Sequence, residues 1–150
     1  MTPINTVKEI SIVYSGPSAE EVSTINSSFD AYEYLLKGFN PDTIGCQEQF
    51  VVAYLNQGNR PLGLYKASQG GITGTVADIR LILSIALKTA AVALIIAHNH
   101  PSGQLKPSRA DEELTRKIME AAKVMDLKLL DHLIVAPCSN YYSFADTGTL

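Results

Sequence analysis

The chain has 150 residues, of which 46% are hydrophobic and 18% are charged. This composition is typical of a folded globular domain and excludes a disordered or fibrous chain. Fifteen acidic and twelve basic residues give a formal net charge of −3, so the chain lacks the overall basic character that binding to a phosphate backbone favours.

The longest continuous apolar run, residues 90–97, is far shorter than the roughly 20 residues of a membrane-spanning helix, so we expect no membrane span. The N-terminal residues lack the basic and apolar segments of a secretory signal. The two cysteines, Cys46 and Cys138, form no pattern of paired spacings. We therefore expect one domain over residues 1–150, in the reducing environment of the cytoplasm.

The first half of the chain predicts a strand, a helix and a hairpin. Residues 7–14 are rich in strand-forming side chains, and Ser28 is expected to cap a short helix over residues 29–37. Residues 48–55 and 62–66 are β-rich runs separated by the turn-forming sequence NQGN, which predicts a hairpin.

The middle of the chain predicts a buried helix followed by a buried strand. Thr75 and Asp78 have the spacing of a helix start, and residues 79–87 are apolar almost all round, which predicts burial on several sides. Residues 91–97 are continuously apolar, which predicts a central strand buried on both faces.

The remaining elements complete an α/β pattern. A helix is predicted from about residue 108 to 125, a long strand over residues 128–136, and a short edge strand over residues 141–144. Helices that alternate with strands in this order predict an α/β fold, with a mixed central β-sheet covered by helices.

Candidate metal ligands follow the predicted central strand. His98 and His100 are two residues apart, so on extended backbone their imidazoles project to the same side and can converge on one ion. Asp111 lies in the first turn of the next helix, and the intervening loop can fold it back toward the histidines. Two imidazoles and one carboxylate can hold zinc with one position left for water, which is a hydrolytic arrangement.

Each part of this pattern also has a structural interpretation. Ser108 and Asp111 have the spacing of a helix capping box. A His-x-His pair alone is more often a surface feature than a metal site. The capping and ligand roles of Asp111 are compatible, and the combined spacing favours metal binding.

The combination of H-x-H-P with S-x-x-D seven residues after the second histidine closely resembles the motif of JAMM (MPN-type) zinc metallopeptidases. Four strings resemble their bacterial RadC branch: HNHPSG from His98, PSRAD ending at Asp111, DHLIV from Asp131, and YSFA from Tyr142. The resemblance covers residues 25–150. It implies a JAMM/MPN architecture of the cytidine-deaminase-like kind.

The resemblance also implies roles for individual residues. His98, His100 and Asp111 are expected to be Zn²⁺ ligands. Ser108 is expected to steady the oxyanion of the tetrahedral intermediate, and Glu48, at the start of the predicted hairpin, to activate the zinc-bound water. The implied reaction is hydrolysis of a peptide or isopeptide bond in a peptide or protein substrate.

An alternative hypothesis is a non-catalytic module that keeps the RadC fold as a DNA-repair accessory or a protein-interaction domain. The RadC family carries a historical DNA-repair label, and its longer members have a helix-hairpin-helix region before this domain. We expect this chain to be a short form without that region. The complete set of ligands and Glu48 favour the hydrolase, and an exposed edge strand would permit a homodimer.

Other residues favour structural interpretations. His132, on an apolar strand, is expected to be a buried histidine with hydrogen-bond partners, because a fourth protein ligand would close the site to water. Cys46 has no evident base and is expected to be inert. Residues 70–74 lack the Lys-Ser/Thr end of a P-loop and are expected to form a turn near the substrate groove.

Two enzymatic alternatives fit less well. A zinc deaminase needs H-x-E and P-C-x-x-C spacing, but Pro137 and Cys138 are not followed by the second cysteine. The letters HNH, read from His98, also match the name of a nuclease class, but that name describes residues dispersed over a ββα unit.

The charge balance generates a prediction about DNA. We expect the isolated chain to show no strong sequence-independent affinity for duplex DNA, because its net charge is −3. Titration of a duplex over a series of salt concentrations tests this. Submicromolar binding at near-physiological salt that weakens steeply as salt rises would contradict the prediction.

Overall fold

The computed structural model describes residues 15–16, 23–70 and 77–150 of the chain. The described elements, in chain order, are α1 (Ser28–Leu36), β1 (Gln49–Leu55), β2 (Pro61–Gln69), α2 (Ile79–Lys88), β3 (Ala93–Asn99), α3 (Arg109–Val124), β4 (Lys128–Ala136) and β5 (Asn140–Ser143). The strand predicted over residues 7–14, together with Thr75 and residues 71–74, lies outside the described residues.

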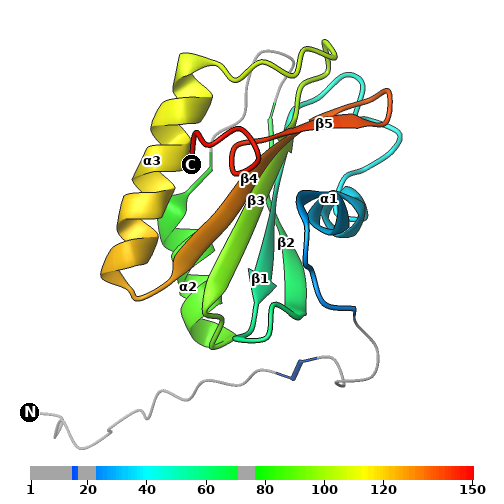
Figure 1. The fold of residues 1–150 in the computed structure, drawn as a ribbon. Coiled ribbons are helices and arrows are strands. Elements are labelled where there is room, and N and C mark those ends of the chain that lie inside the picture. The colour runs from blue at the N-terminus through cyan, green and yellow to red at the C-terminus, as the bar shows by residue number, and fades with distance from the viewer. Residues whose placement is uncertain (1–14, 17–22, 71–76) are drawn as a thin grey trace, which may run out of the picture.

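Five strands form one mixed sheet in the order β2-β1-β3-β4-β5 (Figure 1). β1 pairs antiparallel with both β2 and β3, β3 pairs parallel with β4, and β5 pairs antiparallel with β4. The parallel pair is connected through α3, as a crossover between parallel strands requires. The prediction of a mixed sheet with a central strand after residue 90 is therefore confirmed.

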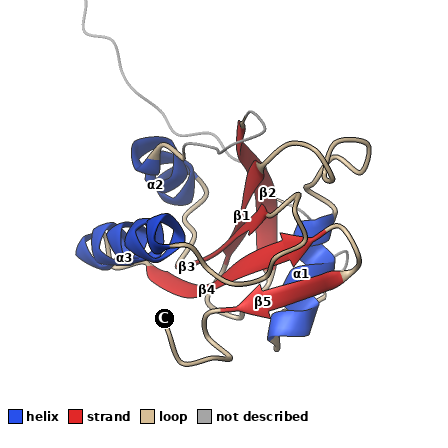
Figure 2. Cartoon of the chain, turned by 90° about the horizontal axis from the view of Figure 1, so that it is seen from above, coloured by secondary structure: helices blue, strands red, loops and turns tan. Residues whose placement is uncertain are grey.

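Helices cover both faces of the sheet, so the molecule has three layers (Figure 2). α1 packs on one face, and α2 and α3 pack on the other. The core on the α1 side includes Leu35, Val51, Ala53, Ile95 and Leu133. The core on the α2 and α3 side includes Val52, Ile82, Ile96, Ile118 and Ala122. β1 and β3 contribute alternate side chains to the two cores because successive strand residues point to opposite faces.

The start of α1 differs from the prediction by one residue. Ser27, not Ser28, is the N-cap, because Ser27 has extended backbone and its Oγ accepts the N–H of Asp30 at 3.1 Å. The hydroxyl of Ser28 instead contacts the C-terminal region, where it donates to Asp146 Oδ2 at 2.5 Å. The two adjacent serines have the same capping chemistry, so the local sequence does not show which of them is the N-cap. The contact of Ser28 with Asp146 joins distant parts of the chain and cannot be predicted from a local pattern.

The expectation that α2 is buried on several sides is wrong. Only Ile82 and Ala86 are buried in this helix, whereas Leu81 is 49% exposed and Leu87 is 47% exposed. One side of α2 faces the sheet, and the hydroxyl of Tyr54 in β1 donates to Ile82 O at 2.9 Å, which fixes that side against the sheet. The apolar residues on the outer side have no layer above them among the described residues.

No helix in the described ranges combines the length and apolar character needed to cross a membrane.

Candidate metal centre

The candidate metal centre begins at the carboxyl end of the central strand β3. His98 lies on the face covered by α2 and α3, between Phe50 of β1 and Ile134 of β4 in the strand pairing. His98 and Phe50 stack at a ring-centroid distance of 6.2 Å. His100 follows, and its N–H donates to Val135 O at 2.9 Å, which continues the contact with β4 beyond the end of the strand.

Asp111 reaches the histidines because it belongs to the N-terminal cap of α3. The Oγ of Ser108 accepts the N–H of Asp111 at 3.1 Å, and Asp111 Oδ2 accepts the N–H of Ser108 at 2.7 Å. This is the capping box that the spacing predicts. The same carboxylate faces both imidazoles, so capping and contact with the histidines coexist in one side chain.

The donor atoms of His98, His100 and Asp111 lie close enough together to hold one ion. The Nε2 atom of His98 is 2.9 Å from His100 Nε2 and 3.1 Å from Asp111 Oδ1. His100 Nε2 is 3.4 Å from Asp111 Oδ2. Tetrahedral zinc, with bonds of about 2.0 to 2.2 Å, keeps its ligand atoms about 3.3 Å apart. In the part of the chain that the structure describes, this is the only such group of His, Cys, Asp and Glu side chains.

The donor atoms of the cluster could hold a cation. The Nδ1 atom of His100 lies 2.7 Å from Gln104 O, which can only accept, so a neutral ring carries its hydrogen on Nδ1 and presents a lone pair at Nε2. In its protonated form His100 donates from Nε2 to Asp111, and this hydrogen bond raises the pKa of His100 above its ordinary value, to which the nearby charge of Glu48 adds. The cluster therefore attracts a positive charge, whether a proton or a metal ion.

The carboxylate of the cluster is ionised. Burial by itself raises the pKa of Asp111, but hydrogen bonds with His100 and His98 outweigh burial and hold the pKa well below its usual range. Two nitrogen donors and one carboxylate oxygen form a donor set that suits zinc better than magnesium or calcium, which prefer oxygen ligands alone.

Glu48 lies directly before β1, and the backbone on both sides of it is fixed. Asn99, which is fully buried, accepts the N–H of Gln49 at 2.6 Å and donates to Gln47 O at 2.8 Å. The N–H of Gly70, after β2, donates to Glu48 O at 2.8 Å. The position of Glu48 is thus set by the end of the strand that carries His98.

Glu48, Ser108 and His100 line one cleft of about 660 Å³. Glu48 and Ser108, the two residues expected to act beside the ligands, thus share this cleft with His100, whereas His98 and Asp111 are not among its lining residues. Cys46 lines the same cleft, and its thiol lies 3.5 Å from Thr43 O, but it is not part of the donor group.

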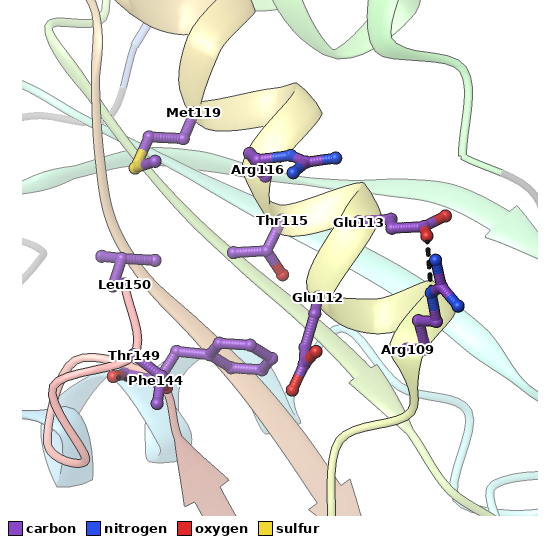
Figure 3. A pocket seen from close by; sticks show the side chains of 9 residues that line it. All are labelled: Arg109, Glu112, Glu113, Thr115, Arg116, Met119, Phe144, Thr149 and Leu150. Atoms are coloured by element: carbon purple, nitrogen blue, oxygen red, sulfur yellow. Dashed lines mark hydrogen bonds and ion pairs between the residues drawn. The ribbon is translucent and has the colours of Figure 1, made fainter.

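A second cavity of about 540 Å³ lies beside the first half of α3 and contains none of the three donors (Figure 3). Its lining residues include Thr115, Phe144 and Leu150. Arg109 Nε contacts Glu113 Oε1 at 3.1 Å at this cavity. The side chain of Arg109 is 91% exposed and that of Glu113 is 47% exposed, so this ion pair contributes little to stability.

Two residues that shape the site were missed in the sequence. Asn99 lies between the two histidines, yet it points to the opposite side of the strand and binds the segment before β1. Thr115 lies on the buried side of α3 and contacts His132, which is itself fully buried. Buried polar side chains were the available signal, but the contacts that reveal their roles, Asn99 with Gln49 and Thr115 with His132, span 50 and 17 positions.

The fold and this donor cluster define an α/β domain with a candidate metal centre, consistent with the JAB/MPN architecture. The sequence model of the RadC-like JAB domain family matches residues 25–149, and the chain belongs to this family. Domains of this family are often hydrolytic.

Curated relatives carry the name UPF0758 protein. Those of Flavobacterium johnsoniae and Streptococcus sanguinis are each 46% identical to the chain, over 101 and 100 residues, and that of Porphyromonas gingivalis is 43% identical over 104 residues. The matched regions cover 67 to 69% of this chain but only 44 to 46% of the relatives. The chain thus spans less than half the length of these relatives.

The role of Asn99 generates a stability prediction. Asn99→Asp is expected to lower the free energy of unfolding by about 3 kcal/mol, because Ile44 O and Gln47 O lose their donor and face a buried oxygen instead. Urea denaturation measures the change. Asn140→Asp is the matched control, because Asn140 is exposed and its side-chain oxygen accepts the N–H of Tyr141. Equal stability of the two variants would contradict the prediction.

Proposed function

We propose that this chain is a zinc-dependent hydrolase of the JAMM type that cleaves a peptide or isopeptide bond. The observation that carries the proposal is the two-histidine, one-carboxylate donor group, whose His100 lines the same cleft as Glu48 and Ser108. Membership of the RadC-like JAB domain family supports the same reaction class.

His98, His100 and Asp111 would hold the zinc ion through two Nε2 atoms and the carboxylate. Zinc, when bound with an open position, acts as a Lewis acid that makes water a nucleophile near neutral pH and polarises a carbonyl oxygen. The three side chains are 15% exposed or less, which limits competition from bulk water for their donor atoms.

Glu48 is the proposed general base. It is half-buried at the cleft and lies outside the donor group, so its carboxylate remains available for a proton from water and can return that proton to the leaving nitrogen. The hydrogen bonds to the backbone around Glu48 limit its movement relative to His100.

Ser108 is the proposed donor to the oxyanion. Its Oγ accepts the N–H of Asp111, and this uses only a lone pair, so the hydroxyl hydrogen can point into the cleft. The capping contact also restricts the side-chain rotation of Ser108, which favours a fixed direction for the donated hydrogen bond.

One prediction of the proposed function concerns the metal. Protein supplied with zinc is expected to hold one ion per chain by elemental analysis, and the double variant His98→Ala plus His100→Ala is expected to hold none. Asp111→Asn is expected to weaken zinc binding, while Glu112→Gln, which removes the same charge one residue along α3, is expected to leave it unchanged. Unchanged zinc uptake in the double variant would show that the ligand assignment is wrong.

The core is expected to be sufficient without the metal. Chelation of zinc should therefore leave the far-ultraviolet circular dichroism unchanged, and unfolding on chelation would show a structural rather than a hydrolytic site.

A further prediction of the proposed function concerns Glu48. Glu48→Gln is expected to keep stoichiometric zinc, because the three ligands are intact, and to lose hydrolysis by about 10²- to 10⁴-fold, the range typical of a general acid or base. The assay incubates zinc-loaded protein with a peptide library in ¹⁸O-labelled water and detects new termini by mass spectrometry. An active Glu48→Gln protein would remove Glu48 from the mechanism, and equal absence of cleavage in both proteins would favour the non-catalytic alternative.

A further inference from the structure

His132 is a fully buried imidazole that lies directly behind His98. It belongs to the DHLIV string of β4, which the proposed reaction leaves without a role. Both ring nitrogens have partners: Nε2 is 2.8 Å from His98 Nδ1, and Nδ1 is 2.6 Å from Thr115 Oγ1. His132 is outside the donor group, so its contacts serve a purpose other than ligation.

The direction of these hydrogen bonds follows from the chemistry of the partners. Thr115 Oγ1 is 2.6 Å from Asp111 O, and a carbonyl oxygen can only accept. The single hydroxyl hydrogen of Thr115 therefore points to Asp111 O. The hydroxyl oxygen then accepts from His132, which places the hydrogen of the His132 ring on Nδ1.

The same reasoning continues to the metal-facing nitrogen. Among the described residues, the two ring nitrogens of His132 contact only Thr115 and His98, and the ring is fully buried, so it is neutral and has a lone pair on Nε2. That lone pair accepts a hydrogen from His98 Nδ1. A neutral His98 with its hydrogen on Nδ1 has its lone pair on Nε2, the atom that faces His100 and Asp111.

The motifs around His132 hold its ring in place. The ring of Phe144 stacks on it at a centroid distance of 4.8 Å and an angle of 7°, and the N–H of Phe144 donates to His132 O at 3.1 Å. The buried carboxylate of Asp131 accepts the N–H groups of His132 and Ala145 and the hydroxyl of Ser143. The DH pair of β4 and the SFA segment thus form one unit around the imidazole.

Thr115 and Phe144 also separate His132 from solvent. They line the cavity beside α3 (Figure 3), and they are only 4% and 1% exposed. Water at this side of α3 therefore does not replace the hydroxyl of Thr115 as the partner of His132.

We propose that His132 is a positioning residue that, through Thr115, holds His98 in the tautomer whose Nε2 binds the metal. This inference rests on the proposed function, because it requires that the cluster bind zinc. Hydrogen bonds from a neighbouring group to the second nitrogen of a ligand histidine commonly change metal affinity by about 10- to 100-fold.

The test uses two substitutions of Thr115. Thr115→Val keeps the branched shape and removes the hydroxyl, whereas Thr115→Ser keeps the hydroxyl and removes the methyl group. Competition with a chromophoric chelator measures the zinc dissociation constant of each full-length protein. Thr115→Val is expected to weaken zinc binding by about 10- to 100-fold, and Thr115→Ser by less than about threefold. A merely packing role would reverse this order, because only the serine variant leaves a void.

A direct readout uses the unsubstituted protein. Long-range ¹H–¹⁵N correlation spectra of the histidine rings are expected to show the Nδ1–H tautomer for His132 and, with zinc bound, for His98. A hydrogen on Nε2 of His132, or equal zinc affinity in the valine variant and the unsubstituted protein, would overturn the inference. Absence of zinc binding by the unsubstituted protein would instead overturn the proposed function on which the inference rests.

Discussion

At the end of β3, three polar side chains lie in a part of the sheet where they have little contact with water. His98 and Asn99 are 3% and 0% exposed, and His100 follows them at the border of the cleft. A buried polar group without a partner costs free energy comparable to a lost hydrogen bond, so each of these groups requires a partner from another part of the chain. The rest of the site can be understood as the set of elements that meet this requirement.

Each partner comes from a different direction. Asn99 binds the segment before β1 and thereby sets the position of Glu48. His98 faces β4 through His132, and His100 faces its own loop through Gln104 O. Buried side-chain nitrogen and oxygen atoms without a partner are absent from the described residues. The hydrogen bonds that make burial of these groups tolerable are thus the same bonds that orient the proposed ligands.

Asp111 connects this arrangement to α3. A carboxylate in the first turn of a helix stabilises the helix through the cap and the helix dipole, so its position does not depend on a metal ion. The helix therefore presents a carboxylate with a lowered pKa to two imidazoles. When both rings are neutral, their Nε2 lone pairs face this carboxylate, and a cation bound between the three groups would relieve the repulsion among them.

Local patterns in the sequence were enough to predict the α/β class, the central strand and the residues of the donor group. The continuous apolar run marked β3, the two-residue spacing put His98 and His100 on one side, and the capping box located Asp111 at the start of α3. These features depend on residues only a few positions apart, whose relative directions are set by backbone geometry. The exposed outer side of α2 was mispredicted because hydropathy alone does not reveal which faces acquire a covering layer.

Only the tertiary structure decided how the site is held. The contact of Asn99 with Gln49 spans 50 positions, that of His98 with His132 spans 34, and that of Thr115 with His132 spans 17. Such contacts depend on which strands become neighbours and on their register, which leaves no periodic mark in the sequence. The sequence alone therefore identified the residues that can bind a metal. The hydrogen-bond directions that orient these residues arise only from the packing of β1, β4 and α3 around the end of β3.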